Sequence, residues 1–198
     1  MMNRRDFLRN SAAGAALIGV GGYVPGVTPV HAAPMHSSLD KAIYDERFRD
    51  SVAFAREAET LRIPTHAIRG DITDLWFKDL DLRWRRDRAM VAGLTTECVM
   101  FCLEQLAWTH HMRVVYRAEH VFLPSGRVAH AFHGSERARA QAGAFDGNDS
   151  SGWAPRVAHV IASVAADPAS RRGVTSVLPA PPRDDQDLLV SWVIASVS

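Results

Sequence analysis

The chain has 198 residues, and its 23 Lys and Arg residues nearly balance 22 Asp and Glu residues, which gives a formal net charge of +1 at pH 7. No long basic tract is present, so charge offers no basis for binding nucleic acid or an anionic membrane surface. Only two residues are cysteines, so the sequence does not encode a disulfide-rich scaffold.

The first part of the chain predicts an export signal. Arg4 and Arg5 are followed by the apolar run Ala12–Val20 and by small residues that end at Ala33. This pattern resembles a twin-arginine signal peptide. The apolar run is too short and too rich in Gly and Ala to span a bilayer stably. The twin-arginine route exports folded proteins, often around a redox cofactor or together with a partner.

We therefore expect residues 1–33 to be a signal peptide and residues 34–198 to form a single globular domain. Removal of the signal leaves about 165 residues, the size of one domain, and a net charge of about −1. Such a domain buries roughly two thirds of its unfolded surface. We expect it in the periplasm or outside the cell, with the twin-arginine translocase as its partner during export.

The elements expected in the first half are helix, strand and helix. The apolar residues between Ser37 and Leu61 recur at helical spacing, and Pro64 ends the pattern. His66–Arg69 is a short candidate strand, and Thr73 begins a further helix.

The second half predicts the centre of the domain. A compact apolar run ends near Leu94 and favours a buried strand, and the helix Glu97–His111 is apolar over most of its circumference. We therefore expect this helix to be buried and packed on more than one side. The remaining expected elements are strands at Arg113–Leu123 and Arg127–His133, a helix from Ser151, and a covered strand at Leu188–Val197.

This order predicts an α/β or α+β fold with a small mixed sheet around a buried central helix. The two cysteines, Cys98 and Cys102, are four residues apart on that helix. Helical spacing does not bring their side chains together at disulfide geometry. We expect them to be buried thiols that pack like small hydrophobic residues.

Cys98 is also a candidate nucleophile. In the first turn of a helix, free N–H groups and the helix dipole favour a thiolate. His130 on a later strand could act as its base, and His133 is an alternative. Asp146 or Asn148 could orient that base. The order Cys98, His130, Asp146 resembles the core of transglutaminase and papain-type thiol enzymes, which would imply a Cys–His hydrolase or transferase. Glu97, beside the thiol, would raise its pKa and oppose activation.

A metal site is a further possibility. Cys98, Cys102, His130 and His133 together supply two sulfur and two nitrogen ligands, which suit copper or zinc. The two histidines would point to opposite faces of a regular strand, so the site requires a bulge near Gly134.

The sequence identifies no reaction and no cofactor, and it leaves open whether the protein is an enzyme. Our first hypothesis is an accessory or partner protein of a periplasmic redox enzyme. It rests on the export signal and on apolar, Trp-rich segments that could contact a redox subunit. A thiol enzyme using Cys98 and His130 is the first alternative, and a metal-binding module is the second.

Overall fold

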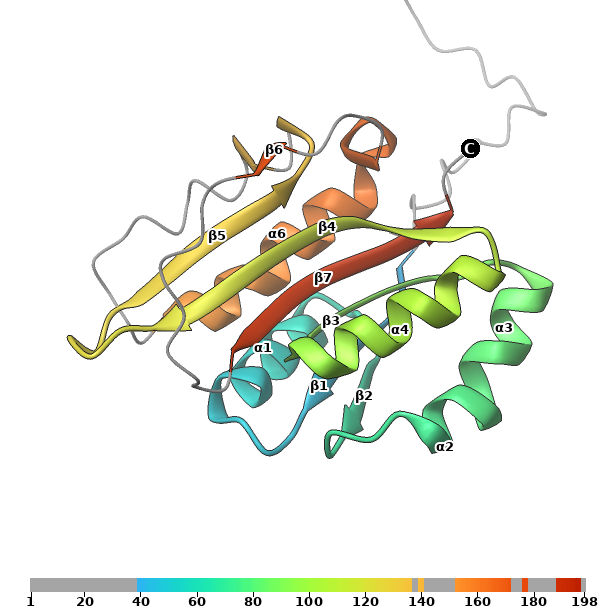
Figure 1. Ribbon diagram of the computed structural model, residues 1–198, viewed down its shortest axis with the longest axis horizontal. Helices are drawn as coiled ribbons and strands as arrows, with labels where there is room; N and C mark the ends of the chain where they lie inside the picture. Colours follow the sequence, from blue (N-terminus) through green and yellow to red (C-terminus); the bar gives the residue numbers. More distant parts are fainter. Residues whose placement is uncertain (1–38, 137–138, 141–151, 172–175, 178–187, 197–198) are drawn as a thin grey trace, which may run out of the picture. The chain divides into compact units, whose positions relative to one another are not determined.

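The computed structural model describes residues 39–136, 139–140, 152–171, 176–177 and 188–196. These residues form one mixed α/β domain built on a seven-stranded sheet of order β2-β1-β3-β7-β4-β5-β6 (Figure 1). The expected α/β class with a mixed sheet is confirmed. The predicted signal, Arg4 and Arg5 included, lies outside the described residues, as do Asp146 and Asn148.

One half of the sheet is parallel. β1 is central here and pairs in parallel with β2 on one side and β3 on the other. The chain therefore runs from β1 outward to β2 and then crosses to the opposite side of β1. This crossover creates a switch point at the carboxyl ends of the strands, where α/β proteins commonly bind ligands. The elements of this half are β1 (Leu39–Asp45), α1 (Arg49–Thr60), β2 (Thr65–Ile68), α2 (Thr73–Leu75), the π-helix η1 (Trp76–Leu80), α3 (Asp81–Arg86) and β3 (Met90–Thr96).

The other half of the sheet is antiparallel. β7 is the last strand in the chain, yet it lies between β3 and β4 and is antiparallel to both. Residues Leu189–Ala195 of β7 are all buried, which confirms the prediction of a covered interior strand. The elements of this half are α4 (Glu97–Thr109), β4 (Met112–Phe122), β5 (Val128–Gly134), α6 (Trp153–Ala166), the 3₁₀ helix η3 (Pro168–Arg171), β6 (Ser176–Val177) and β7 (Leu189–Ser196).

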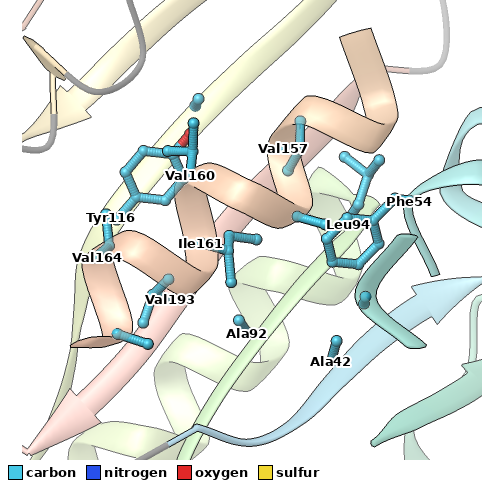
Figure 2. Packing of buried hydrophobic residues seen from close by; sticks show 14 of the residues in the cluster. Ala42, Phe54, Ala92, Leu94, Tyr116, Val157, Val160, Ile161, Val164 and Val193 are labelled. Carbon is cyan, nitrogen blue, oxygen red and sulfur yellow. The ribbon is translucent and has the colours of Figure 1, made fainter. Parts of the chain in front are cut away.

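Helices cover both faces of the sheet. On one face, which we call the α6 face, α1 and α6 pack over a core that includes Phe54, Leu94, Ile161 and Val193 (Figure 2). On the other, the α4 face, α2, α3 and α4 pack over Val91, Trp192 and their neighbours. Among the described residues, no helix combines the length and the apolar character needed to cross a membrane.

The helix predicted from Ser37 to Leu61 is wrong in its first part. Leu39–Asp45 form β1, and α1 begins only at Arg49. Ala42 and Ile43 are both completely buried, because β1 has helices on both faces and strands on both sides. β1 also carries Asp40, Lys41 and Asp45 among its seven residues, so it is no continuous apolar run. Leu39 and Ile43 are four residues apart, which matches helical spacing.

The helix predicted at Glu97–His111 exists as α4, but it does not pack on more than one side. Its inner residues Val99, Leu103 and Ala107 are buried against the sheet. On its outer side Phe101 is 55% exposed and Trp108 is 50% exposed. Apolar residues around the whole circumference therefore do not identify a central helix in this chain.

Candidate functional site

The site lies where β3 ends and α4 begins. Thr96 is the last residue of β3, and Glu97 is the first residue of α4 with no loop between them. Cys98 is consequently the second residue of α4, in the turn whose backbone N–H groups have no partner within the helix. This turn sits at the carboxyl edge of the parallel strands.

A groove of about 460 Å³ runs beside Cys98, between the loop that follows β2 and the outer side of α4. Both Cys98 and Cys102 are exposed and line it. The prediction that they are buried is therefore wrong, because the buried side of α4 is occupied by other residues. The remaining groove residues are Gly70, Asp71, Ile72, Thr73, Val99, Phe101, Gln105 and Leu106.

The two thiols interact with each other. The pKa of the Cys102 thiol is raised, first by burial and then by the charge of Cys98 and the hydrogen bond between the two sulfur atoms. The neighbouring Cys98 sulfur thus adds to the effect of burial and makes ionisation of Cys102 less favourable. Both cysteines are free in this structure.

Glu97 does not line the groove, although it adjoins Cys98 in the sequence. Its carboxylate accepts a hydrogen bond of 2.8 Å from Arg117 of β4. The same Arg117 nitrogen donates at 2.9 Å to Glu119. One arginine therefore holds both carboxylates, and Glu97 is directed towards β4 rather than into the groove.

The loop that forms the other wall of the groove is tightly held. Gly70 has φ of +80°, and the Arg47 guanidinium packs directly against it. Asp71 Oδ1 accepts hydrogen bonds from the Thr73 backbone N–H at 2.8 Å and from its hydroxyl at 2.7 Å. These bonds lower the pKa of Asp71, so this wall carries a negative charge at neutral pH.

Arg47 connects this loop to the end of β1. Its Nε donates to Asp45 Oδ1 at 2.9 Å and its Nη2 to Oδ2 at 2.6 Å, while Asp45 itself is completely buried. Neither residue was predicted to be functional, because both fall within the helix expected between Ser37 and Leu61. The sequence feature that could have identified them is Asp45 at the end of a strand, followed two residues later by Arg47.

His130 does not approach Cys98. It lies on β5 and points to the α6 face, where its Nδ1 is 2.7 Å from Nδ1 of His120 and its ring contacts Trp153 of α6. Cys98 belongs to α4, which covers the opposite face. The sheet therefore separates the two residues, and the structure does not form the predicted Cys98–His130 pair.

The proposed metal ligands do not converge either. His133 points to the α4 face, where its Nε2 is 3.8 Å from Glu119 Oε1. Three residues earlier on the same strand, His130 points the other way, as regular alternation requires. In the part of the chain that the structure describes, no three His, Cys, Asp or Glu side chains are grouped as a metal site requires.

The histidine prediction missed a buried chain of polar side chains on the α6 face. His120 Nε2 is 2.8 Å from the Ser191 hydroxyl, which is 3.4 Å from the Tyr116 hydroxyl. Burial and the neighbouring His130 lower the pKa of His120 well below its ordinary value, and burial raises that of Tyr116. The sequence feature that could have identified this pair is the equal spacing of the two histidines, each five residues from the turn residue Ser125. In a hairpin this spacing places them opposite each other, as the observed pairing of His120 with His130 shows.

The fold and this geometry define a mixed α/β protein with an exposed thiol pair at the carboxyl edge of its parallel strands. Comparison with protein-family models finds no match, and comparisons with curated proteins and with solved structures find none either.

Proposed function

We propose that the protein acts through the Cys98 thiol as a nucleophile, in hydrolysis or in covalent group transfer. The observation that carries this proposal is the exposure of Cys98 to the groove from the first turn of α4. The helix dipole and the free backbone N–H groups of this turn favour negative charge on a group that reacts beside the sulfur. The Cys102 thiol lines the same groove one turn along the helix.

A nucleophile fits this pair better than a dithiol that cycles through an internal disulfide. Cys98 and Cys102 are one helical turn apart on α4. Disulfide formation needs Cβ atoms about 3.8 Å apart, so α4 would have to distort at its first turn. The spacing instead suits one reacting sulfur atom and one hydrogen-bond donor beside it.

The groove supplies several parts of such a reaction. The Cys98 sulfur would attack a carbonyl carbon of the substrate, and backbone N–H groups of the first turn of α4 would stabilise the negative charge that moves onto the carbonyl oxygen. When the C=O bond forms again, the leaving group would depart with the proton lost by the thiol, and water or an acceptor would then release the acyl group from the sulfur. Among the described residues that line the groove, none is a histidine.

A second candidate function is the accessory role in an exported redox system. The outer side of α4 favours it, because the exposed Phe101 and Trp108 are residue types enriched where proteins contact each other. The twin-arginine pattern around Arg4 and Arg5 supports periplasmic or secreted localisation, which remains part of this proposal.

Alkylation kinetics test the nucleophile. The native protein is treated with iodoacetamide at pH 7, and mass spectrometry assigns the modified cysteine. We expect Cys98 in the native protein to react at least about tenfold faster than Cys98 in the urea-unfolded chain, because free thiols are mostly protonated at this pH. The variant Cys102→Ser should keep most of this advantage. Equal rates in the native and the unfolded protein would contradict the proposal.

A further inference from the structure

The groove beside Cys98 has a single charged side chain among the described residues that line it. That residue is Asp71, in the loop that follows β2. Hydrogen bonds from the backbone N–H and the hydroxyl of Thr73 lower the pKa of Asp71, so its carboxylate is ionised at neutral pH. Both bonds end on Oδ1. The loop therefore holds Asp71 through one oxygen atom and leaves the other, Oδ2, outside these bonds.

The charge of Asp71 is not compensated by the cations of the surrounding segments. Three cations lie on this loop, against it or shortly after it in the chain, and each pairs with another acid. The pairs are Arg47 with Asp45, Arg69 with Glu46 and Lys78 with Asp74. No ion pair within the described part of the chain includes Asp71, and no cation contributes to the shift of its pKa. The groove therefore carries a net negative charge at this wall.

The wall on α4 adds an aromatic ring. Phe101 lines the groove and is 55% exposed. The face of an aromatic ring attracts a cation, as a carboxylate does. Ile72 and Leu106 line the same groove with apolar side chains. The volume of about 460 Å³ is within the range of small-molecule sites. These walls therefore suit a small molecule that has a positive group and an apolar chain.

We propose that the groove takes acyl substrates that carry an ammonium or guanidinium group, and that Asp71 binds this group while the carbonyl carbon meets Cys98. The acyl part of this class rests on the proposed function, whereas the preference for a cation does not. Asp71 and Cys98 line the same groove, so one small molecule contacts both. Asp71 is then a specificity-determining residue, because an anionic substrate is repelled and a neutral one gains no ion pair.

Reagents of opposite charge test the preference for a cation. In Cys102→Ser the only thiol is that of Cys98, since the chain has two cysteines. Trimethylammonioethyl and sulfonatoethyl methanethiosulfonate each form a mixed disulfide with a thiol and release methanesulfinate. Each rate is divided by the rate of the same reagent with mercaptoethanol. We expect the cationic reagent to be preferred at least about fivefold at low salt, and the preference to decrease as salt is added.

Asp71→Asn should remove this preference. Asparagine keeps an acceptor oxygen for Thr73, so the loop should stay in place. Asp74→Asn is the matched control, since it changes the net charge equally, but Asp74 pairs with Lys78 and does not line the groove. It should leave the preference unchanged. A preference that persists in Asp71→Asn, that both variants lose equally, or that does not respond to salt would overturn the inference.

Two esters test the substrate class. The para-nitrophenyl esters of aminohexanoate and hexanoate differ in one ammonium group, and transfer of either acyl group to Cys98 releases para-nitrophenol. We expect the cationic ester to acylate Cys98 at least about fivefold faster, and Asp71→Asn to abolish the difference. Mass spectrometry identifies the acylated residue. Equal rates for the two esters would overturn the substrate class and leave Cys98 as a nucleophile. If neither ester acylates Cys98, the proposed function fails, and the methanethiosulfonate rates alone decide whether Asp71 selects a cation.

Discussion

Arg47 holds the buried carboxylate of Asp45 through two hydrogen bonds and at the same time packs against Gly70. One side chain therefore fixes both the end of β1 and the loop that follows β2. Because that loop forms a wall of the groove beside Cys98, the shape of the groove depends on a residue that does not line it.

Gly70→Ala should destabilise the protein by about 2 kcal/mol. A Cβ atom at Gly70 would lie 2.4 Å from Arg47 Nη2, and the φ of +80° adds strain. Displacement of Arg47 would leave the completely buried Asp45 carboxylate without this ion pair. Urea unfolding at pH 7 measures the free energy of unfolding.

Gly126→Ala is the matched control for this change. Gly126 also has a positive φ, +77°, but no atom of another residue lies within 4 Å of its added Cβ. The free energy of unfolding of Gly126→Ala should therefore decrease only by the backbone strain, about 1 kcal/mol. An equal decrease in the free energy of unfolding for Gly70→Ala and Gly126→Ala would mean that the contact between Gly70 and Arg47 contributes nothing to stability.

The buried His120 should make stability fall as the pH falls. Its pKa is lowered in the folded protein by burial and by His130, so the unfolded chain binds the proton more readily. The contribution of the neutral His120 to the free energy of unfolding is fully present above the ordinary histidine pKa of about 6.5. Below that pH it decreases by at most about 1.4 kcal/mol per pH unit. Urea unfolding at pH 7.5 and at pH 5.0 should show this loss.

His120→Gln should reduce that pH dependence, because the glutamine does not titrate. His159→Gln is the control, since His159 is exposed on α6 and bonds to Glu57 at the surface. If His120→Gln keeps the full difference between the two pH values, the buried histidine is not its cause.

Leu103→Ala should cost about 2–5 kcal/mol, because the side chain is completely buried under α4 and its removal leaves a cavity. Leu106→Ala should cost less, since Leu106 is only half-buried. Phe101→Ala, on the exposed side of the same helix, should be close to neutral at a protein concentration of about 1 µM. Thermal or urea unfolding separates the three variants, and a neutral Leu103→Ala would contradict the packing of α4 on the sheet.

Export should depend on the arginine pair. Replacement of both Arg4 and Arg5 by lysine should leave a full-length precursor in the cytoplasm, because the twin-arginine translocase recognises this pair. Cell fractionation and immunoblotting measure the distribution, with Arg9→Lys as a control. Normal periplasmic accumulation of the double variant would contradict the predicted localisation.

Several elements could be predicted from the local sequence pattern alone. The strand–helix passage at Thr96–Glu97, the hairpin of β4 and β5 and the covered strand β7 were all expected near their observed positions. β1 was missed, because Leu39 and Ile43 have helical spacing within a charged segment, and its pairing with β2 and β3 is not local.

The site was predicted only in part, because it also depends on the pairing of strands that are distant in the sequence. Cys98 could be placed in the first turn of a helix from local sequence alone. Whether His130 faces it depends on which face of the sheet each residue occupies, and a shift of one residue in register reverses that answer. The Arg47–Asp45 pair and the contact with Gly70 join segments that only the assembled sheet brings together.

The position of β7 has a consequence for how the chain acquires its fold during synthesis. The residues Leu189–Ser196 are synthesised after β3 and β4, yet they join these two strands at the middle of the sheet. Until they arrive, both neighbouring strands expose unpaired backbone edges, which favour non-native association. The two halves of the sheet can therefore be joined only after β7 has been synthesised, and a nascent chain that is interrupted before β7 should be a target for chaperones and proteases rather than a partly active domain.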